Sequence, residues 1–242
     1  MKQRLDGRKF DEVRPVIAKV GIVKNAIGSA MFQIGKTRAI AAVYGPRELY
    51  PRFLQNPEKG LLRCNYNMLP FSGTNGGRIR PGGNRRAKEI GLVTQKALLP
   101  ALDLSEFPNA VVDVFIEIEQ SDAGTRCAGI CAASMALAHA GFQMKDLVSA
   151  ISVGIVDNEI IADIDYKEEH YPEFAKEEIK SEYSTDIPVA MMSNLDKFTL
   201  LQLDGRAKSD ELKKSLEMAK KACQDIYEIQ KKALKQAYEV QK

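Results

Sequence analysis

The sequence lacks the marks of a membrane or secreted protein. No run of apolar residues approaches the ~18 that a membrane-spanning helix needs, and the first ten residues, MKQRLDGRKF, have no apolar core of the kind found in a secretory signal. We therefore expect a cytoplasmic protein. The 242 residues contain no long repeat and no linker, so the length favours a single domain, 1–242, with a sizeable core.

Cysteine and histidine are too few to suggest zinc or nucleophile chemistry. The four cysteines form no CxxC pair, and only two histidines are present to complete a metal site. Cys127 and Cys131 lie four residues apart in an alanine-rich run, which is typical of buried, reduced thiols. No serine–histidine–acid arrangement stands out around His139 or His170. The chain is therefore not expected to use a nucleophile of its own.

The chain has only a small excess of positive charge, but cationic residues are concentrated in residues 78–88. The formal net charge is only +3, which does not by itself indicate a nucleic-acid-binding protein. In the stretch GGRIRPGGNRRAKE, however, the cations Arg78, Arg80, Arg85, Arg86 and Lys88 fall close together. Asn84 is a candidate N-cap for a helix over 85–102, and two arginines in its first turn oppose the helix dipole unless an anion lies there. The glycine-rich loop before them suits a nucleic-acid backbone, or is simply a soluble loop.

The apolar pattern predicts a mixture of strands and helices. Residues 39–46 form a near-continuous apolar run, typical of an inner strand covered on both faces, and residues 110–119 alternate as a strand does. Two hairpins are expected later in the chain, with turns at 157–158 and 194–196. These elements predict an α+β fold in which mixed sheets pack against helices.

Three segments stand apart from this regular order. Residues 1–14 are polar and are expected to form an extended N-terminal arm. Residues 166–185 are highly charged, lie between two predicted strands, and are expected to form an exposed insertion. Residues 208–242 repeat apolar side chains at helical spacing, so a long C-terminal helix is predicted, with its lysine- and glutamate-rich face in solvent.

The stretch SDAGTRCAGIC carries the clearest candidate site. It follows a predicted strand and opens a helix of small residues that ends at Gly141. A helix N-terminus offers unpaired N–H groups and partial positive charge, glycine lets an anion approach the backbone, and threonine and arginine add donors. Gly124, Thr125 and Arg126 are therefore candidates for an oxyanion cradle. The alternative is an ordinary helix cap with a surface arginine.

Asp186 is a further candidate. It enters the apolar strand STDIPVAMM without a partner in that strand. Such an aspartate either caps the preceding loop or holds a divalent cation beside the phosphate site. The residues alone leave both possibilities open.

Together, these motifs resemble the RNase PH family, and more closely the catalytic, RNase PH-like subunits of the archaeal exosome. The resemblance rests on six stretches that occur in family order: LDGRKFDEVRP, IAAVYGPRE, LLRCNYNMLPFS, RPGGNRRAKEI, QSDAGTRCAGICAASMALA and DIPVAMM. The GTR turn and NRRAKEI are the most specific of these. The resemblance implies the RNase PH fold, which is shared with the second domain of a ribosomal S5-like protein.

The resemblance also implies an activity, 3′→5′ phosphorolysis of RNA. Inorganic phosphate attacks the terminal phosphodiester and releases a nucleoside diphosphate, the reverse reaction adds nucleotides, and Mg²⁺ assists. The motifs assign phosphate binding to Arg86, Gly124, Thr125 and Arg126. They assign catalysis and metal binding to Asp186, and RNA contacts to Arg63, Arg80 and Arg85. The implied partners are single-stranded RNA, a homologous inactive subunit that alternates with this chain in a hexameric ring, and cap subunits with S1-type domains.

Two positions depart from the family pattern. A second acid usually precedes the catalytic aspartate, but this chain has Lys180 there, so the insertion leaves either Glu169 or Glu182 as that acid. We favour Glu169 as the second metal ligand. Asn65 replaces a usual arginine in LLRCNY, which removes one cationic RNA contact. Two other functions remain open: a homo-oligomeric RNase PH that trims tRNA 3′ ends, and an inactive RNA-binding scaffold subunit.

Overall fold

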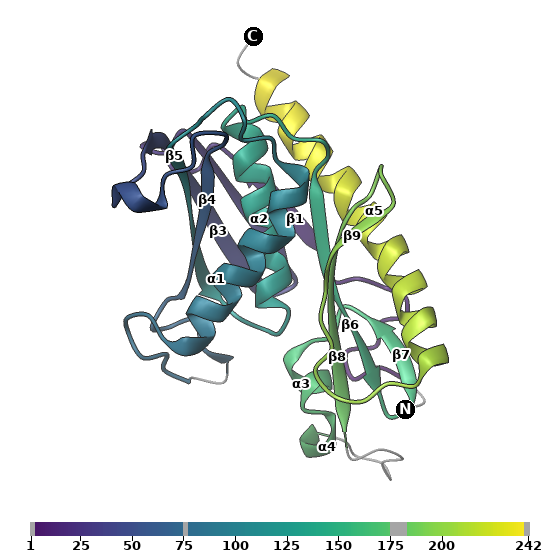
Figure 1. The fold of residues 1–242 in the computed structure, drawn as a ribbon. Coiled ribbons are helices and arrows are strands. Elements are labelled where there is room, and N and C mark those ends of the chain that lie inside the picture. The colour runs from purple at the N-terminus through teal and green to yellow at the C-terminus, as the bar shows by residue number, and fades with distance from the viewer. Residues whose placement is uncertain (1–2, 75–76, 175–182, 240–242) are drawn as a thin grey trace.

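The computed structural model describes residues 3–74, 77–174 and 183–239, and over these it confirms an α+β fold (Figure 1). Two sheets form, with strand orders β1-β2-β3-β5-β4 and β7-β6-β8-β9. The strands are β1 (Val16–Val20), β2 (Gly28–Ile34), β3 (Thr37–Glu48), β4 (Leu61–Met68), β5 (Ala110–Gln120), β6 (Val148–Val156), β7 (Glu159–Ala162), β8 (Ser184–Met192) and β9 (Lys197–Leu201). The helices are η1 (Arg52–Leu54), α1 (Arg85–Leu98), η3 (Leu99–Ala101), α2 (Thr125–His139), α3 (Tyr166–Glu169), α4 (Tyr171–Phe174) and α5 (Ser209–Glu239).

Helix α1 begins where the sequence predicts. The Asn84 side chain accepts a hydrogen bond from the backbone N–H of Ala87 at 2.7 Å, which satisfies one free donor of the first turn. The helix joins β4 to β5, which run parallel, and packs on β4. This connection brings the arginine-rich first turn of α1 to the same end of the molecule as the start of α2.

Helix α2 lies between the two sheets. It packs on β2 and β3 of the first sheet and on β6 of the second, so small residues are needed on nearly every side. The approach to β2 is closest at Gly28, where an added Cβ would lie 2.3 Å from the carbonyl oxygen of Ala136. Gly141 follows the last turn with φ +84°, as a helix-terminating glycine does. The four cysteines are buried and free of disulfides.

Strand β3 is an inner strand, but only one of its faces is fully covered. Ala39, Ala41 and Val43 are fully buried against the helices. Their neighbours on the other face, Ile40 and Tyr44 among them, are half-buried. The prediction that residues 39–46 are covered on both faces is therefore wrong for the outer face, because in the described chain no helix packs there.

The second sheet contains both predicted hairpins. Asp157 and Asn158 have φ of 51° and 66°, the left-handed values that a tight two-residue turn between β6 and β7 requires. The β8–β9 turn includes Asp196, also with positive φ. Helix α5 packs along this sheet and against β1, within the predicted range 208–242 (Figure 1). No helix in the described residues is long and apolar enough to cross a membrane.

The two irregular segments pack near each other on the second sheet. Residues 3–14 form turns in place of an extended arm, and their Arg4 side chain is bonded to Glu168. The first part of the predicted insertion forms α3 and α4. The expected exposure is wrong for Glu168 and Tyr171, which are buried, and residues 184–185 already belong to β8. Residues 175–182 of that prediction lie outside the described residues.

Candidate functional site

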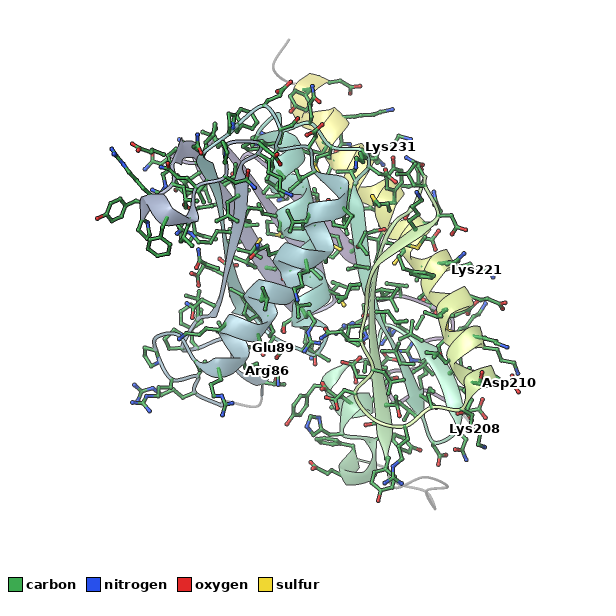
Figure 2. The ribbon with its side chains drawn as sticks, viewed as in Figure 1. Arg86, Glu89, Lys208, Asp210, Lys221 and Lys231 are labelled. Carbon is green, nitrogen blue, oxygen red and sulfur yellow. The ribbon has the colours of Figure 1, made fainter. Side chains whose placement is uncertain are left out.

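Six residues chosen from the sequence line one cavity of about 450 Å³. The cavity lies where the N-terminal ends of α1 and α2 face α3 and β8. The six residues are Arg86, Gly124, Thr125, Arg126, Glu169 and Asp186. Figure 2 shows Arg86 at the N-terminal end of α1, the end that borders the cavity.

The turn before α2 is held in an uncommon backbone conformation. Ala123 and the N-cap Gly124 have φ of 56° and 63°, so both adopt the left-handed region. The buried Thr37 stabilises this turn, because its hydroxyl donates to the carbonyl of Ala123 at 2.7 Å and accepts from the N–H of Asp122 at 2.8 Å. The turn therefore presents the free N–H groups of the α2 N-terminus to the cavity.

The Thr125 hydroxyl is oriented by a neighbouring tyrosine. Tyr66 Oη donates to Thr125 Oγ1 at 2.9 Å, so the threonine proton stays available to an anion. Burial raises the pKa of Tyr66, and the positive charges of Arg86 and Arg126 oppose that rise. Two guanidinium groups from different helices thus act on the same small volume.

Arg126 is oriented by a neutral partner. Its Nη1 donates to the side-chain oxygen of Gln202, a residue that follows β9 and bonds to the Pro188 carbonyl at 3.0 Å. A glutamine fixes the direction of the guanidinium without neutralising its charge. The charge of Arg126 is therefore available to a bound anion.

The opposite side of the cavity is acidic. Ser152 on β6 donates to Asp186 Oδ1 on the neighbouring strand β8. The pKa of Asp186 is raised to about 6, chiefly by burial and also by the nearby carboxylates of Glu169 and Asp204, while the Ser152 bond and Arg126 oppose the rise. Asp186 thus titrates far closer to neutral pH than an ordinary aspartate.

Asp186 and Glu169 repel each other in the cavity and could together bind a divalent cation. Asp186 and Glu169 line the same cavity, and their repulsion contributes to the raised pKa of Asp186. A bound cation would relieve that repulsion. No group of three or more potential metal ligands occurs among the described residues. Two carboxylates are nevertheless a set that Mg²⁺ accepts, because it keeps several waters and uses substrate phosphates as further ligands.

Three predicted RNA contacts lie outside this cavity. Arg80 is exposed in the loop before α1, and Arg85 is exposed in the first turn of α1. Arg63 on β4 bonds through Nε to Oδ1 of the fully buried Asp113 at 2.5 Å, on the outer face of the first sheet. Arg63 is therefore already paired, whereas Arg80 and Arg85 project into solvent.

Several lining residues had no role assigned from the sequence. Arg78 lies in the predicted basic cluster and borders the cavity, whereas Arg80 does not. Tyr166 and His170 also line it, with ring centroids 4.3 Å apart. Ser152 could not be recognised because its position beside Asp186 depends on the pairing of β6 with β8, which the intervening segment separates in the chain.

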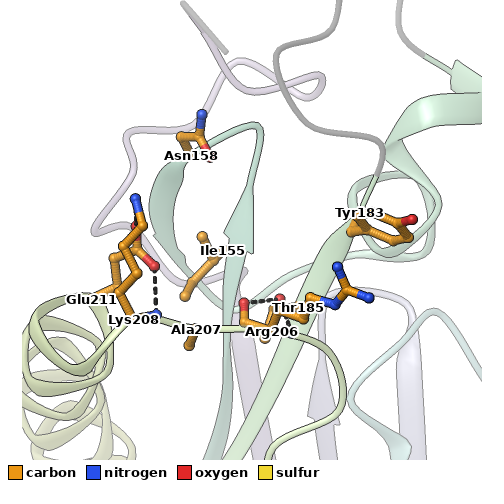
Figure 3. A pocket seen from close by; sticks show the side chains of 8 residues that line it. All are labelled: Ile155, Asn158, Tyr183, Thr185, Arg206, Ala207, Lys208 and Glu211. Atoms are coloured by element: carbon orange, nitrogen blue, oxygen red, sulfur yellow. Dashed lines mark hydrogen bonds and ion pairs between the residues drawn. The ribbon is translucent and has the colours of Figure 1, made fainter.

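A second cavity, of about 280 Å³, lies at the N-terminal end of α5 (Figure 3). It is lined by Ile155, Asn158, Tyr183, Thr185, Arg206, Ala207, Lys208 and Glu211. Figure 3 shows the Lys208 backbone bonded to Glu211 and the Thr185 side chain bonded to Arg206, so these groups satisfy each other. This cavity contains none of the predicted site residues, and the first cavity remains the candidate site.

Comparison with known proteins shows similarity to one family along most of the chain. Domain 1 of the 3′ exoribonuclease family matches residues 12–143, and domain 2 matches residues 146–222. The exosome complex component Rrp41 of Methanopyrus kandleri is 46% identical over 227 residues, covering 94% of this chain and 90% of that protein. The Rrp41 of Pyrococcus furiosus is 48% identical over 228 residues, covering 94% of this chain and 86% of that protein.

Two solved structures have a similar fold. Rice Rrp46 matches with a TM-score of 0.78 and 25% identity, over 96% of this chain and all of that one. A chain of the Archaeoglobus fulgidus exosome, solved with RNA bound to the active site, matches with a TM-score of 0.76 and 22% identity, over 94% of this chain and 92% of that one. Both likenesses extend over nearly the whole chain.

Proposed function

The chain belongs to the 3′ exoribonuclease family, and on that premise we propose that it is the catalytic subunit of an archaeal-type exosome core that degrades RNA by phosphorolysis. One observation carries the proposal. A single cavity brings the N-terminus of α2, Arg86 and Arg126 opposite the acids Asp186 and Glu169. An inactive scaffold subunit would not need arginines and acids that face each other across one cavity.

The reaction needs a bound phosphate more than a reactive side chain. An oxygen of inorganic phosphate attacks the phosphorus of the last phosphodiester, the bond to the preceding 3′ oxygen breaks, and a nucleoside 5′-diphosphate leaves. Gly124, Thr125 and Arg126 would hold the phosphate, and Arg86 would reduce its repulsion from the RNA. The same contacts would bind a nucleoside diphosphate in the reverse direction, which adds nucleotides to the 3′ end.

The acidic side would serve the leaving oxygen. Without a metal, Asp186, whose pKa is about 6, retains a protonated fraction near neutral pH and would donate a proton to the departing 3′ oxygen; with Mg²⁺ bound, its carboxylate would act as a ligand instead. Asp186 and Glu169 would hold Mg²⁺, which supplies positive charge to the phosphates. Ser152 would keep the Asp186 carboxyl turned toward the cavity.

A partner subunit is part of the proposal. The outer face of the first sheet carries partly exposed apolar residues, including Ile17 at 46% and Phe115 at 37% exposure. A homologous subunit in a hexameric ring would cover such a face, and cap subunits with S1-type domains would guide single-stranded RNA. Exposed Arg80 and Arg85 are the proposed RNA-backbone contacts, together with half-exposed Arg63 on β4, the edge strand of that sheet.

Reconstitution with the companion subunit tests this function. The chain, alone and mixed with its homologous partner, is incubated with single-stranded RNA, Mg²⁺ and phosphate, and nucleoside diphosphates are measured. We expect release only with phosphate present, and full activity only in the mixture. Cleavage that proceeds without phosphate contradicts the proposal. Full activity of the chain alone, as a closed homo-oligomer, favours the RNase PH that trims tRNA ends.

Arg126→Ala provides a site-specific arm of the same experiment. The phosphate KM should rise by about 10- to 100-fold, because a hydrogen bond to a charged group is worth about 1.5–3 kcal/mol. Arg52→Ala is the matched control, since Arg52 is a well-exposed arginine of η1 outside the cavity. An equal effect of the two substitutions would remove Arg126 from the phosphate site.

A further inference from the structure

The N-terminal segment 3–14 makes two buried ion pairs with the segment that follows β7, one with Asp163 and one with Glu168 of α3. Arg4 donates from Nε and Nη2 to the two carboxylate oxygens of the fully buried Glu168, both at 2.7 Å. Arg14 donates from Nε and Nη2 to the two carboxylate oxygens of the buried Asp163, also at 2.7 Å. Removing one partner of such a pair leaves an unpaired buried charge, so each pair holds its two segments together.

Arg14 differs from Arg4 because it also reaches the turn that follows β5 of the first sheet. Its Nη1 donates to the backbone carbonyl of Asp122 at 2.5 Å and lies 3.6 Å from the Asp122 carboxylate. Asp122 belongs to the turn 121–124, which presents the N-terminus of α2 to the cavity. Asp163, on the other side, lies shortly before α3. One guanidinium group therefore joins the phosphate-binding turn to the segment that carries Glu169.

The surroundings of Arg14 are built closely around it. An added Cβ at Gly35 would lie 2.5 Å from Arg14 Cδ, and Gly35 has φ +55°, so both space and backbone conformation favour glycine there. The backbone N–H of Tyr166, the first residue of α3, also donates to Asp122 Oδ1 at 3.4 Å. The turn and α3 are thus joined directly as well as through Arg14.

We propose that Arg14 is a positioning residue for phosphate, which holds the turn 121–124 against α3 so that the anion cradle faces Asp186 and Glu169. The inference rests on the proposed function. Arg14 does not line the cavity itself, so it would not touch phosphate or RNA. Its loss should therefore act through the placement of the turn, and affect phosphate binding more than RNA binding.

The test compares Arg14→Lys with Arg4→Lys in the assembled enzyme. Lysine keeps the positive charge but cannot bond to Asp163 and Asp122 in the same geometry. Arg4→Lys is the matched control, because Arg4 is also a buried, bidentate arginine, and its hydrogen bonds within the described residues do not reach the turn 121–124. The measurements are Tm, kcat, the KM for phosphate and for RNA, and the Kd of phosphate alone by calorimetry without RNA.

We expect Arg14→Lys to raise the phosphate KM and Kd by about tenfold or more, because a small displacement of a binding group lowers both the rate and the affinity. The KM for RNA should change little. Arg4→Lys should lower Tm without raising the phosphate KM. Equal losses of Tm in both variants, with the phosphate KM unchanged in both, would overturn the inference while leaving phosphorolysis by the unsubstituted enzyme intact.

Asp122→Ala tests the same connection from the side of the turn. It removes the carboxylate that accepts from Tyr166 and faces Arg14, without leaving a buried guanidinium unpaired, because Asp163 still holds Arg14. We expect a rise of about threefold or more in the phosphate KM. Asp122→Ala keeps the backbone carbonyl that accepts from Arg14 Nη1. If Arg14→Lys does not fold, the same measurement is therefore made on Gly35→Ala, whose added Cβ would displace Arg14 Cδ. An unchanged phosphate KM in both Gly35→Ala and Asp122→Ala then overturns the proposal.

Discussion

Individual charged residues in this chain are held where their charge is unfavourable. Asp186 is mostly removed from water and lies near other carboxylates, which together raise its pKa to about 6. Arg85 and Arg86 open α1, where the helix dipole already supplies positive charge and no acid occurs in the first turn. Each arrangement becomes favourable only when an ion of opposite sign is present, which is the condition a substrate or metal site creates.

The raised pKa of Asp186 predicts how its stability contribution changes with pH. Its folded-state pKa lies above the ordinary value of 3.8, so this residue costs no stability below about pH 4 and becomes increasingly costly up to about pH 6. Two pKa units correspond to about 3 kcal/mol above that pH. Without metal, Asp186→Asn should therefore raise Tm more at pH 7.5 than at pH 5, as measured by calorimetry.

The same substitution should reduce phosphorolysis by about 10²-fold or more, because an amide cannot exchange a proton with the leaving oxygen. Asparagine can still accept the Ser152 hydrogen bond, so the fold should be retained. The matched control is Asp196→Asn, at an exposed turn residue, which should change neither the pH dependence of Tm nor the rate. A rise in Tm of the same size at both pH values would contradict the assigned cause.

At the scale of elements, the close packing of α2 on β2 positions the anion cradle. Helix α2 carries Ala, Gly and Cys on faces toward both sheets, so the two sheets approach it closely from opposite sides. Gly28 makes the closest approach, because its Cα lies against the backbone of Ala136 and Ala140. Any substitution that moved α2 away from β2 would also displace the anion cradle, Gly124–Arg126, at the N-terminus of α2.

Gly28→Ala should therefore destabilise the protein. Its Cβ would lie 2.3 Å from the Ala136 carbonyl oxygen and 2.5 Å from the backbone nitrogen of Ala140, and backbone atoms cannot rotate aside. We expect a loss of about 1–3 kcal/mol in the free energy of unfolding, measured with urea. Gly83→Ala is the control, since an added Cβ there meets nothing within 4 Å. Equal stability of both variants would mean that β2 and α2 separate easily.

For the whole molecule, the distribution of charge matters more than its sum. The net charge of +3 conceals a basic loop and first turn beside the cavity, while the lysines of α5 are balanced by acids along the same helix. Figure 2 shows Lys221 on α5 on the far side of the second sheet from Arg86. RNA is expected to follow the basic side.

Salt dependence provides the corresponding measurement. Arg85→Ala should reduce the slope of log Kd against log salt by about 0.7, the loss of one phosphate contact on a single strand. RNA binding is measured by fluorescence anisotropy between low and moderate salt. Lys221→Ala, also an exposed cation, is the control and should leave the slope unchanged. A flat salt response in the unsubstituted protein would argue against backbone recognition altogether.

Much of this architecture is local and could be predicted from the sequence. The N-cap at Asn84, the turn at Asp157–Asn158 and the helix end at Gly141 each depend on hydrogen bonds or φ values within a few residues. The anion cradle Gly124–Arg126 is contiguous in the chain, so its chemistry can be predicted without knowing the fold. The outer face of β3 was mispredicted because an apolar run does not tell which of its faces a helix covers.

The sequence by itself determined most of the strands and helices, the helix caps and the Gly124–Arg126 motif that we propose to bind phosphate, because short-range geometry sets these. Only the tertiary structure placed Glu169 beside Asp186 and Arg78 beside the cavity, whereas Lys180 and Glu182 lie outside the described residues. The raised pKa of Asp186 and the position of Arg14 between two segments were likewise decided by the fold. Desolvation and long-range ion pairs depend on which surfaces meet, and that information exists only once the two sheets close around α2.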